Sequence, residues 1–251
     1  MSLIDLLELP GNVWLVDLPG NGDNTQNIPA EFDFDTWFPT FQSVIPKFKN
    51  PILVGHSFGG MFPLCFPELE NELKGFVILN SAPCLPMEEA VAYAKNYDVP
   101  DLTKEMEAFV LNPNNDTFRD ALNACLPYYF PKQTLELGKA LLANVPFQFM
   151  PAVWWQRKAV EMQFSAKWIP ENIPTLILSG TYDCIVPHYL FERDLRFQRK
   201  NIEMKNIEEG GHMPWIENPE VVKAAFEKFC VRLNGAKIVE EKMLGDKRAA
   251  E

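Results

Sequence analysis

One serine of the sequence lies in a pattern typical of an enzymatic nucleophile. A Gly-x-Ser-x-Gly pattern centred on Ser57 follows the apolar run at 52–54 and precedes a helix-like run from Gly60. A serine between a strand and a helix occupies a tight turn, and we expect the two flanking glycines to relieve steric crowding there. Because a hydroxyl is a weak nucleophile at neutral pH, a base must lie within hydrogen-bond reach of it.

Histidine is the usual base for a serine, and the chain has three histidines. We expect the His56 side chain to point away from that of Ser57, and His188 to be partly exposed at the start of a helix. His212 lies in a glycine-opened loop directly after the strand predicted at 202–207. Because such a loop can reach over the carboxyl ends of parallel strands, His212 is the predicted base.

A carboxylate must fix the tautomer of the histidine and stabilise its protonated form. Asp183 fits this role because it follows the strand predicted at 175–178, again on the carboxyl side. An aspartate at such a place is also a common turn former, so its position alone does not decide its role. The order along the chain is Ser57, Asp183 and His212, each after a predicted strand.

The elements that must position these residues predict an α/β fold with a helical insertion. Short, continuous apolar runs predict strands of a mostly parallel, doubly wound sheet, at 13–16, 52–54, 76–79, 175–178 and 202–207. A helix is predicted at 34–48, and its aromatic residues are interpreted as core. Helical periodicity broken by prolines predicts an inserted cap at 84–172, with helices near 87–96, 102–111, 117–126, 134–143 and 152–164.

The core is then expected to comprise 1–83 and 173–233. A closing helix is predicted at 219–233, and the charged tail at 234–251 is predicted to be a frayed helix without a function of its own.

Composition limits the possible partners. The chain has 251 residues and a net charge of −11, which argues against binding to nucleic acid or to an anionic membrane surface. Its five cysteines are scattered, without a Cys-x-x-Cys pair, which argues against a disulfide framework and a structural metal. No apolar run approaches the roughly 20 residues of a membrane span, and a cytoplasmic protein is predicted. The expected partner is a small-molecule substrate, no metal or organic cofactor is required, and the oligomeric state stays open.

From about residue 11 to residue 233 the chain resembles the capped branch of the α/β-hydrolase superfamily. The similarity rests on an aspartate-to-glycine turn at 17–22, the serine turn at 55–59, an acid loop at 180–183 and a histidine loop at 211–219. The order of serine, aspartate and histidine is that of this superfamily and not that of chymotrypsin or subtilisin. The resemblance implies an oxyanion hole that includes the backbone N–H of Phe58. A serine at position 57, where the epoxide hydrolase and haloalkane dehalogenase branches have aspartate, argues against those branches.

The resemblance also implies further strands before residue 11. One of them would end in a His-Gly segment that supplies a second oxyanion donor, and would lie between the strands predicted at 13–16 and 52–54. Loss of one such donor costs on the order of 3 kcal/mol of transition-state stabilisation. We therefore expect a sequence shortened at its N-terminus relative to the family. If Met1 is the true start, a weak or inactive hydrolase is expected.

The cap contains many aromatic residues that could line an apolar pocket, although most of them are expected to pack in the core. These residues are Tyr128, Tyr129, Phe130, Phe147, Phe149, Trp154, Trp155 and Trp168. The leading hypothesis is a serine hydrolase of small apolar esters or thioesters that forms an acyl-enzyme intermediate. Trp154, Trp155 and Arg157 are its candidate substrate contacts.

Three other functions stay open. An aminopeptidase similar to proline iminopeptidases would hold the substrate amine with Glu105, Glu107 or Glu161. A hydrolase of carbon–carbon bonds would hold a substrate acid with Arg157. A non-catalytic binding protein that retains the fold is the alternative outside enzymology.

Overall fold

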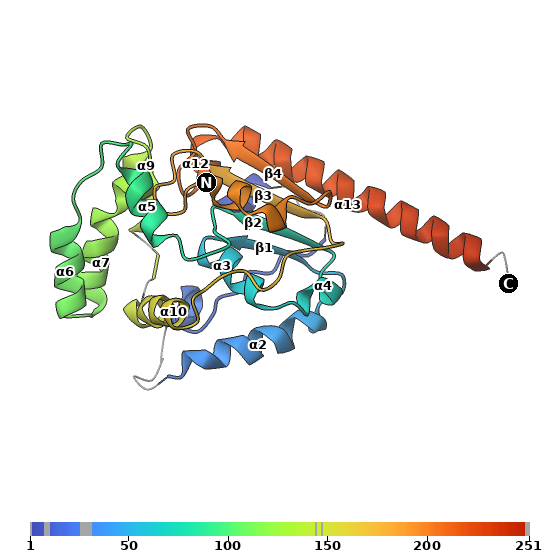
Figure 1. Cartoon of the computed structure of the whole chain (residues 1–251), viewed down its shortest axis with the longest axis horizontal. Coiled ribbons are helices and arrows are strands. Elements are labelled where there is room, and N and C mark those ends of the chain that lie inside the picture. Colours follow the sequence, from blue (N-terminus) through green and yellow to red (C-terminus); the bar gives the residue numbers. More distant parts are fainter. Residues whose placement is uncertain (1, 8–10, 26–31, 144, 147, 249–251) are drawn as a thin grey trace.

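The core of the molecule is a four-stranded parallel sheet. The computed structural model describes residues 2–7, 11–25, 32–143, 145–146 and 148–248, with side chains described as far as residue 233. The strands lie in the order β1-β2-β3-β4 (Figure 1). Their bounds are Ile52–His56, Gly75–Leu79, Thr175–Gly180 and Ile202–Ile207. Four of the five predicted strands and the α/β fold class are thereby confirmed.

Alternate side chains of the central strands pack on opposite faces of the sheet. Phe76 and Ile78 contact a cluster that includes Trp37 of α2 (Trp37–Val44). Val77 and Leu79 contact the other cluster, which contains residues of α13 (Pro219–Arg248). Figure 1 shows α2 and α13 on the two sides of the sheet. Because both faces are covered, β2 and β3 are buried along their whole length, as their continuous apolar runs predict.

Five of the described helices between β2 and β3 lie close to the predicted ones, and a sixth, α8 (Leu126–Tyr129), was not predicted. The five are α5 (Met87–Ala94), α6 (Thr103–Leu111), α7 (Asn115–Ala124), α9 (Leu135–Leu142) and α10 (Phe149–Glu161). The helix predicted at 34–48 is formed by α2 with a 3₁₀ turn on each side, Phe34–Thr36 and Ile45–Lys47. Helix α13 continues without a break to Arg248 and extends away from the body of the molecule (Figure 1).

The remaining described helices are short. They are α1 (Leu3–Leu6), α3 (Phe58–Met61), α4 (Leu69–Glu72), α11 (Tyr189–Arg193) and α12 (Pro214–Glu217). Further 3₁₀ turns occupy Gly22–Thr25, Phe62–Cys65 and Leu195–Phe197.

The prediction of a strand at 13–16 is wrong. These residues are outside every strand, and their side chains are exposed, with 67% of the Trp14 surface accessible. A groove of about 1530 Å³ is lined by Val13 to Val16, by residues of β1 that include Ile52 and Val54, and by residues of α1 and α13. Because a strand needs a hydrogen-bonded neighbour, an apolar run that lines a groove without pairing to β1 does not form one. Strand β1 is consequently an edge strand, and Ile52 and Val54 are partly exposed on it.

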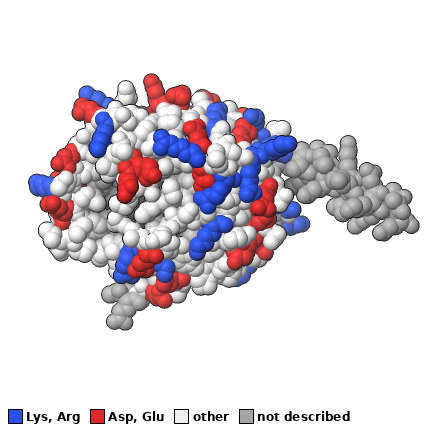
Figure 2. All heavy atoms as spheres, in the orientation of Figure 1, with Lys and Arg blue, Asp and Glu red and all other residues white. Residues whose placement is uncertain are grey.

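Positive and negative side chains are interspersed over the face of the molecule shown in Figure 2. None of the described helices is long and apolar enough to cross a membrane.

One carboxylate fastens the chain segment that leads into β3. Glu70, on α4, accepts hydrogen bonds from the Trp168 indole and from the backbone N–H groups of Glu171 and Asn172. Burial raises the pKa of Glu70, but these bonds favour the charged form more strongly, and the pKa lies below its ordinary value near 4.5. The carboxylate form therefore stabilises the folded state.

We expect Glu70→Gln to lower the free energy of unfolding by about 1 kcal/mol at pH 7, a value reduced because the carboxylate is only partly buried and solvent screens its interactions. A depressed folded-state pKa contributes stability above the ordinary value and loses it as pH falls through the folded pKa. The difference between wild type and Glu70→Gln, measured by urea denaturation, should therefore shrink between pH 6 and pH 3. Glu72→Gln, on the exposed side of the same helix, is the control and should show no such dependence.

Candidate active site

Ser57 occupies the strained turn that its sequence pattern predicts. It lies between β1 and α3 with φ 52° and ψ −122°, a backbone conformation that few residues with a side chain adopt. The Ser57 N–H donates to the Leu79 carbonyl at 2.9 Å, and the Ser57 carbonyl accepts from the Ser81 hydroxyl at 2.8 Å and from the N–H groups of Gly60 and Met61. Leu79 is the last residue of β2 and Ser81 follows it closely, so the neighbouring strand helps to fix the turn.

The glycines around the serine have different reasons to be glycine. A Cβ at Gly55 would overlap the Gly59 carbonyl, so close backbone approach requires glycine there. A Cβ at Gly59 would meet no atom within 4 Å, so the expectation that both flanking glycines relieve crowding is wrong for this one. The second tight position is Gly60 instead, where a Cβ would lie 2.8 Å from the Ser81 side chain.

Asp183 and His212 form a buried pair. His212 Nδ1 lies 2.7 Å from Asp183 Oδ2, and both side chains are almost inaccessible to solvent. Because a carboxylate only accepts, the imidazole carries its proton on Nδ1, which leaves Nε2 free to accept a proton. Asp183 also accepts from the Asn80 amide at 2.9 Å and from the N–H groups of Ile185 and Val186. Four donors thus satisfy the buried carboxylate.

The backbone of the histidine loop makes hydrogen bonds to several other parts of the chain. The Gly211 N–H donates to Glu217 Oε2 at 3.2 Å, and the Gly211 carbonyl accepts from the Asn80 amide at 2.9 Å. The His212 N–H donates to the Tyr129 carbonyl at 2.7 Å, and the His212 carbonyl lies 2.7 Å from His56 Nε2. Each of these bonds goes to a different element, so the loop is fixed by β1, β2, α8 and α12 together.

Sequence reasoning missed several of these partners. Asn80 follows β2 directly and holds both the acid loop and the histidine loop, so the rule that found Asp183 and His212 could have found it. Glu217, which also accepts from the Thr134 hydroxyl at 2.7 Å, lies in the histidine motif itself. Tyr129 acts through its backbone carbonyl and therefore leaves no signal in its residue type.

The Ser57 hydroxyl makes no hydrogen bond with any described residue. The adjacent residue, His56, is hydrogen-bonded to the histidine loop, and the rings of His56 and His212 have their centroids 4.7 Å apart. Catalytic hydrogen bonds are often long or poorly aligned in structures without substrate. His188 lies apart from the pair, with its Nδ1 3.3 Å from the Tyr93 hydroxyl.

The three candidate substrate contacts lie on α10 in different surroundings. Trp154 is buried beside Trp37 and donates its indole N–H to Asp35. Trp155 is partly buried and packs its ring against Phe58, the residue after the serine, with centroids 4.7 Å apart. Arg157 is on the exposed face of the helix and pairs with Glu161 at 3.6 Å.

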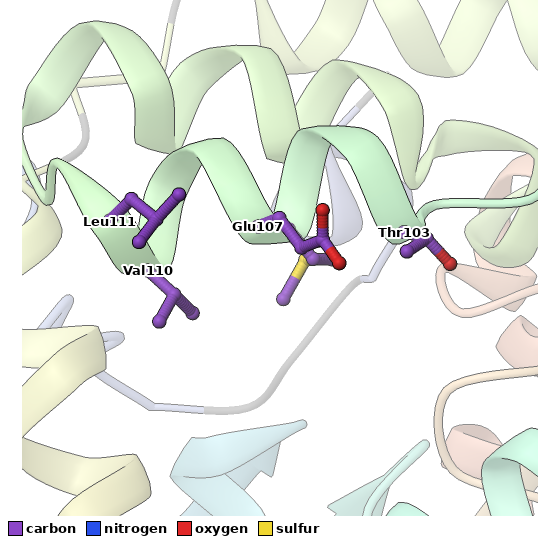
Figure 3. Close-up of a pocket in the computed structure, with 5 residues that line it drawn as sticks. Thr103, Glu107, Val110 and Leu111 are labelled. Carbon is purple, nitrogen blue, oxygen red and sulfur yellow. The ribbon is translucent and has the colours of Figure 1, made fainter.

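Most of the other aromatic residues in this helical segment are away from the serine turn or under the histidine loop. Trp168 stacks on Phe76 in the core, and the Tyr129 ring packs against His212 with centroids 4.9 Å apart. Phe147 is outside the described residues. Glu107 lies with Thr103, Val110 and Leu111 along one face of α6, beside a shallow pocket of about 510 Å³ (Figure 3).

We expect Gly60→Ala to lower the free energy of unfolding by about 1–3 kcal/mol, because the added methyl must displace the Ser81 side chain. Gly59→Ala is the matched control, and it should be neutral or slightly stabilising because alanine favours a helix and meets no neighbour. Chemical denaturation of the two variants measures the difference. Equal stabilities would contradict the assignment of Gly60 as the tight position.

Comparison with known proteins gives the family. A model described as the alpha/beta hydrolase family matches residues 2–225. "Putative esterase/lipase 1" of Mycoplasma genitalium is 23% identical over 223 residues, which cover 82% of this chain and 77% of that protein. The pimeloyl-(acyl-carrier protein) methyl ester esterase of Xylella fastidiosa is 24% identical over 252 residues, which cover 92% and 89%.

A solved structure agrees on the fold. The alpha/beta fold family hydrolase from Bacillus anthracis has a TM-score of 0.57 and 17% sequence identity, covering 77% of this chain and 73% of that one. The parallel sheet, the loops at its carboxyl edge and the match over most of the chain lead to one conclusion. The chain belongs to the alpha/beta hydrolase family.

Proposed function

We propose that the chain is a serine esterase with Ser57 as nucleophile, His212 as its base and Asp183 as the group that orients the base. The observation that supports the proposal is the buried Asp183–His212 pair, which leaves Nε2 of His212 available, on a ring that packs against His56, the residue before Ser57. A pair of this kind has a use in acyl transfer, because the carboxylate stabilises the imidazolium that forms when the serine proton is taken.

In the proposed reaction the Ser57 oxygen attacks the ester carbonyl carbon while His212 Nε2 takes the hydroxyl proton. The Phe58 N–H, which makes no hydrogen bond with any described residue, would donate to the oxyanion. His212 then protonates the departing alcohol or thiol, and an acyl-enzyme remains. A water molecule deprotonated by His212 releases the acid and restores the Ser57 hydroxyl.

Two features support an apolar ester or thioester as substrate. The names of both sequence relatives refer to esterases. The Trp155 ring lies against Phe58, where it would contact an apolar acyl or alcohol group. We retain Trp154 and Arg157 as candidate contacts of lower rank. Trp154 is buried in the core. Arg157, which a carbon–carbon bond hydrolase would need, forms an ion pair with Glu161, one of the glutamates that an aminopeptidase would use.

Ser57→Ala should abolish covalent labelling of the chain by a fluorophosphonate probe, because the probe reacts with an activated serine. Labelling is the more sensitive measurement here, since it requires attack by the serine but no turnover. Ser43→Ala is the control, and it should still be labelled because Ser43 is exposed on α2 and its hydroxyl bonds within that helix. A wild-type chain that is folded and unlabelled would favour the non-catalytic binding protein.

Trp155→Ala should lower kcat/KM for p-nitrophenyl butyrate by about tenfold, mainly through KM, because the butyryl group loses an apolar contact worth about 1–2 kcal/mol. Gln156→Ala, at the next and exposed position of the same helix, should leave kcat/KM for this ester unchanged. If both variants, or neither, lost activity, Trp155 would not line the substrate site.

A further inference from the structure

His56 joins the strand that carries the serine turn to the loop that carries His212. Its Nε2 lies 2.7 Å from the His212 carbonyl oxygen, and its ring contacts the rings of His212 and Trp215, at centroid distances of 4.7 and 5.0 Å. Because a carbonyl oxygen can only accept a hydrogen bond, His56 must be the donor. The bond therefore fixes which nitrogen of His56 carries the proton.

This bond is the direct polar link between β1 and the histidine loop. Among the described residues, the other bonds of Gly211 and His212 go to Glu217, Asn80, Tyr129 and Asp183. The Ser57 hydroxyl itself makes none. The distance between the serine and the base therefore depends on β1 being held to the loop, and a misplacement of about 1 Å can cost on the order of 100-fold in rate.

The surroundings keep the His56 ring neutral. Burial lowers its pKa, and the nearby His212 lowers it further, to about 3, although the bond to the His212 carbonyl and the charge of Asp183 act in the opposite direction. The titratable groups close to the ring are thus His212 and Asp183. A neutral His56 favours proton uptake by His212, because two imidazolium rings this close would repel each other.

We propose that His56 is a positioning residue for the proposed reaction: its neutral ring donates Nε2–H to the His212 carbonyl and holds the base in reach of Ser57. The inference rests on the proposed function and deepens it. It assigns a second histidine to the site, one that transfers no proton in the reaction and that must not become charged while His212 does.

Two variants separate the hydrogen bond from the packing of the ring. His56→Phe keeps an aromatic ring against Trp215 and lacks the donor, whereas His56→Gln has an amide N–H in place of Nε2–H. The kinetics of fluorophosphonate labelling give a rate constant kinact and a half-saturation constant KI. We expect His56→Phe to lower kinact by about 10- to 100-fold with little change in KI, and His56→Gln to restore most of the loss.

The melting temperature of each variant distinguishes positioning from stability. Equal values of kinact for wild type and His56→Phe would overturn the proposal. A loss of kinact that is equal in both variants and follows their melting temperatures would also overturn it, because the donor would then be irrelevant. These failures differ from failure of the proposed function, which would leave the wild-type chain itself unlabelled.

A measurement on the unmodified chain does not depend on either variant folding. ¹⁵N NMR of the imidazole nitrogens should find His56 as the neutral Nε2–H tautomer throughout pH 5 to 8. A titration of His56 in that range, or a proton on Nδ1, would overturn the proposal.

Discussion

The hydrogen bond between His212 Nδ1 and Asp183 Oδ2 is the interaction on which the architecture around it depends. An ionised carboxylate that is wholly buried is costly unless every lone pair finds a donor, and Asp183 meets this need with two backbone N–H groups, the Asn80 amide and the imidazole. These donors come from three separate loops. The chain must therefore bring the ends of β2, β3 and β4 together before the pair can be buried.

The helices between β2 and β3 complete the same site. Carbonyl groups of α8 accept from the N–H groups of Cys184 and His212, one in the acid loop and one in the histidine loop. A Cβ at Gly211 would overlap the Tyr129 carbonyl, so the close approach of α8 requires glycine there. The glycine before His212 therefore has a packing reason. Movement of these helices would change the two loops together.

The sequence allowed the sheet and the pairing of Asp183 with His212 to be predicted, since both residues follow strands whose carboxyl ends meet at one edge. Their catalytic roles stay predictions. Asn80 follows the same rule and was missed because an asparagine after a strand is also a common turn residue. The hydrogen bond that the His212 N–H donates to α8 could not be predicted, because its acceptor is a backbone carbonyl that any residue would supply.

The segment at 13–16 shows why an apolar run is not sufficient evidence for a strand. Its residues have the composition of a buried parallel strand, as do those of β1, yet both line the same groove. Composition reports what a segment can bury, whereas a strand also requires a neighbour that completes its hydrogen bonds. Strand β1 meets this requirement through β2 alone. It is nevertheless held in place at its carboxyl end, where His56 bonds to the histidine loop and Ser57 bonds to β2.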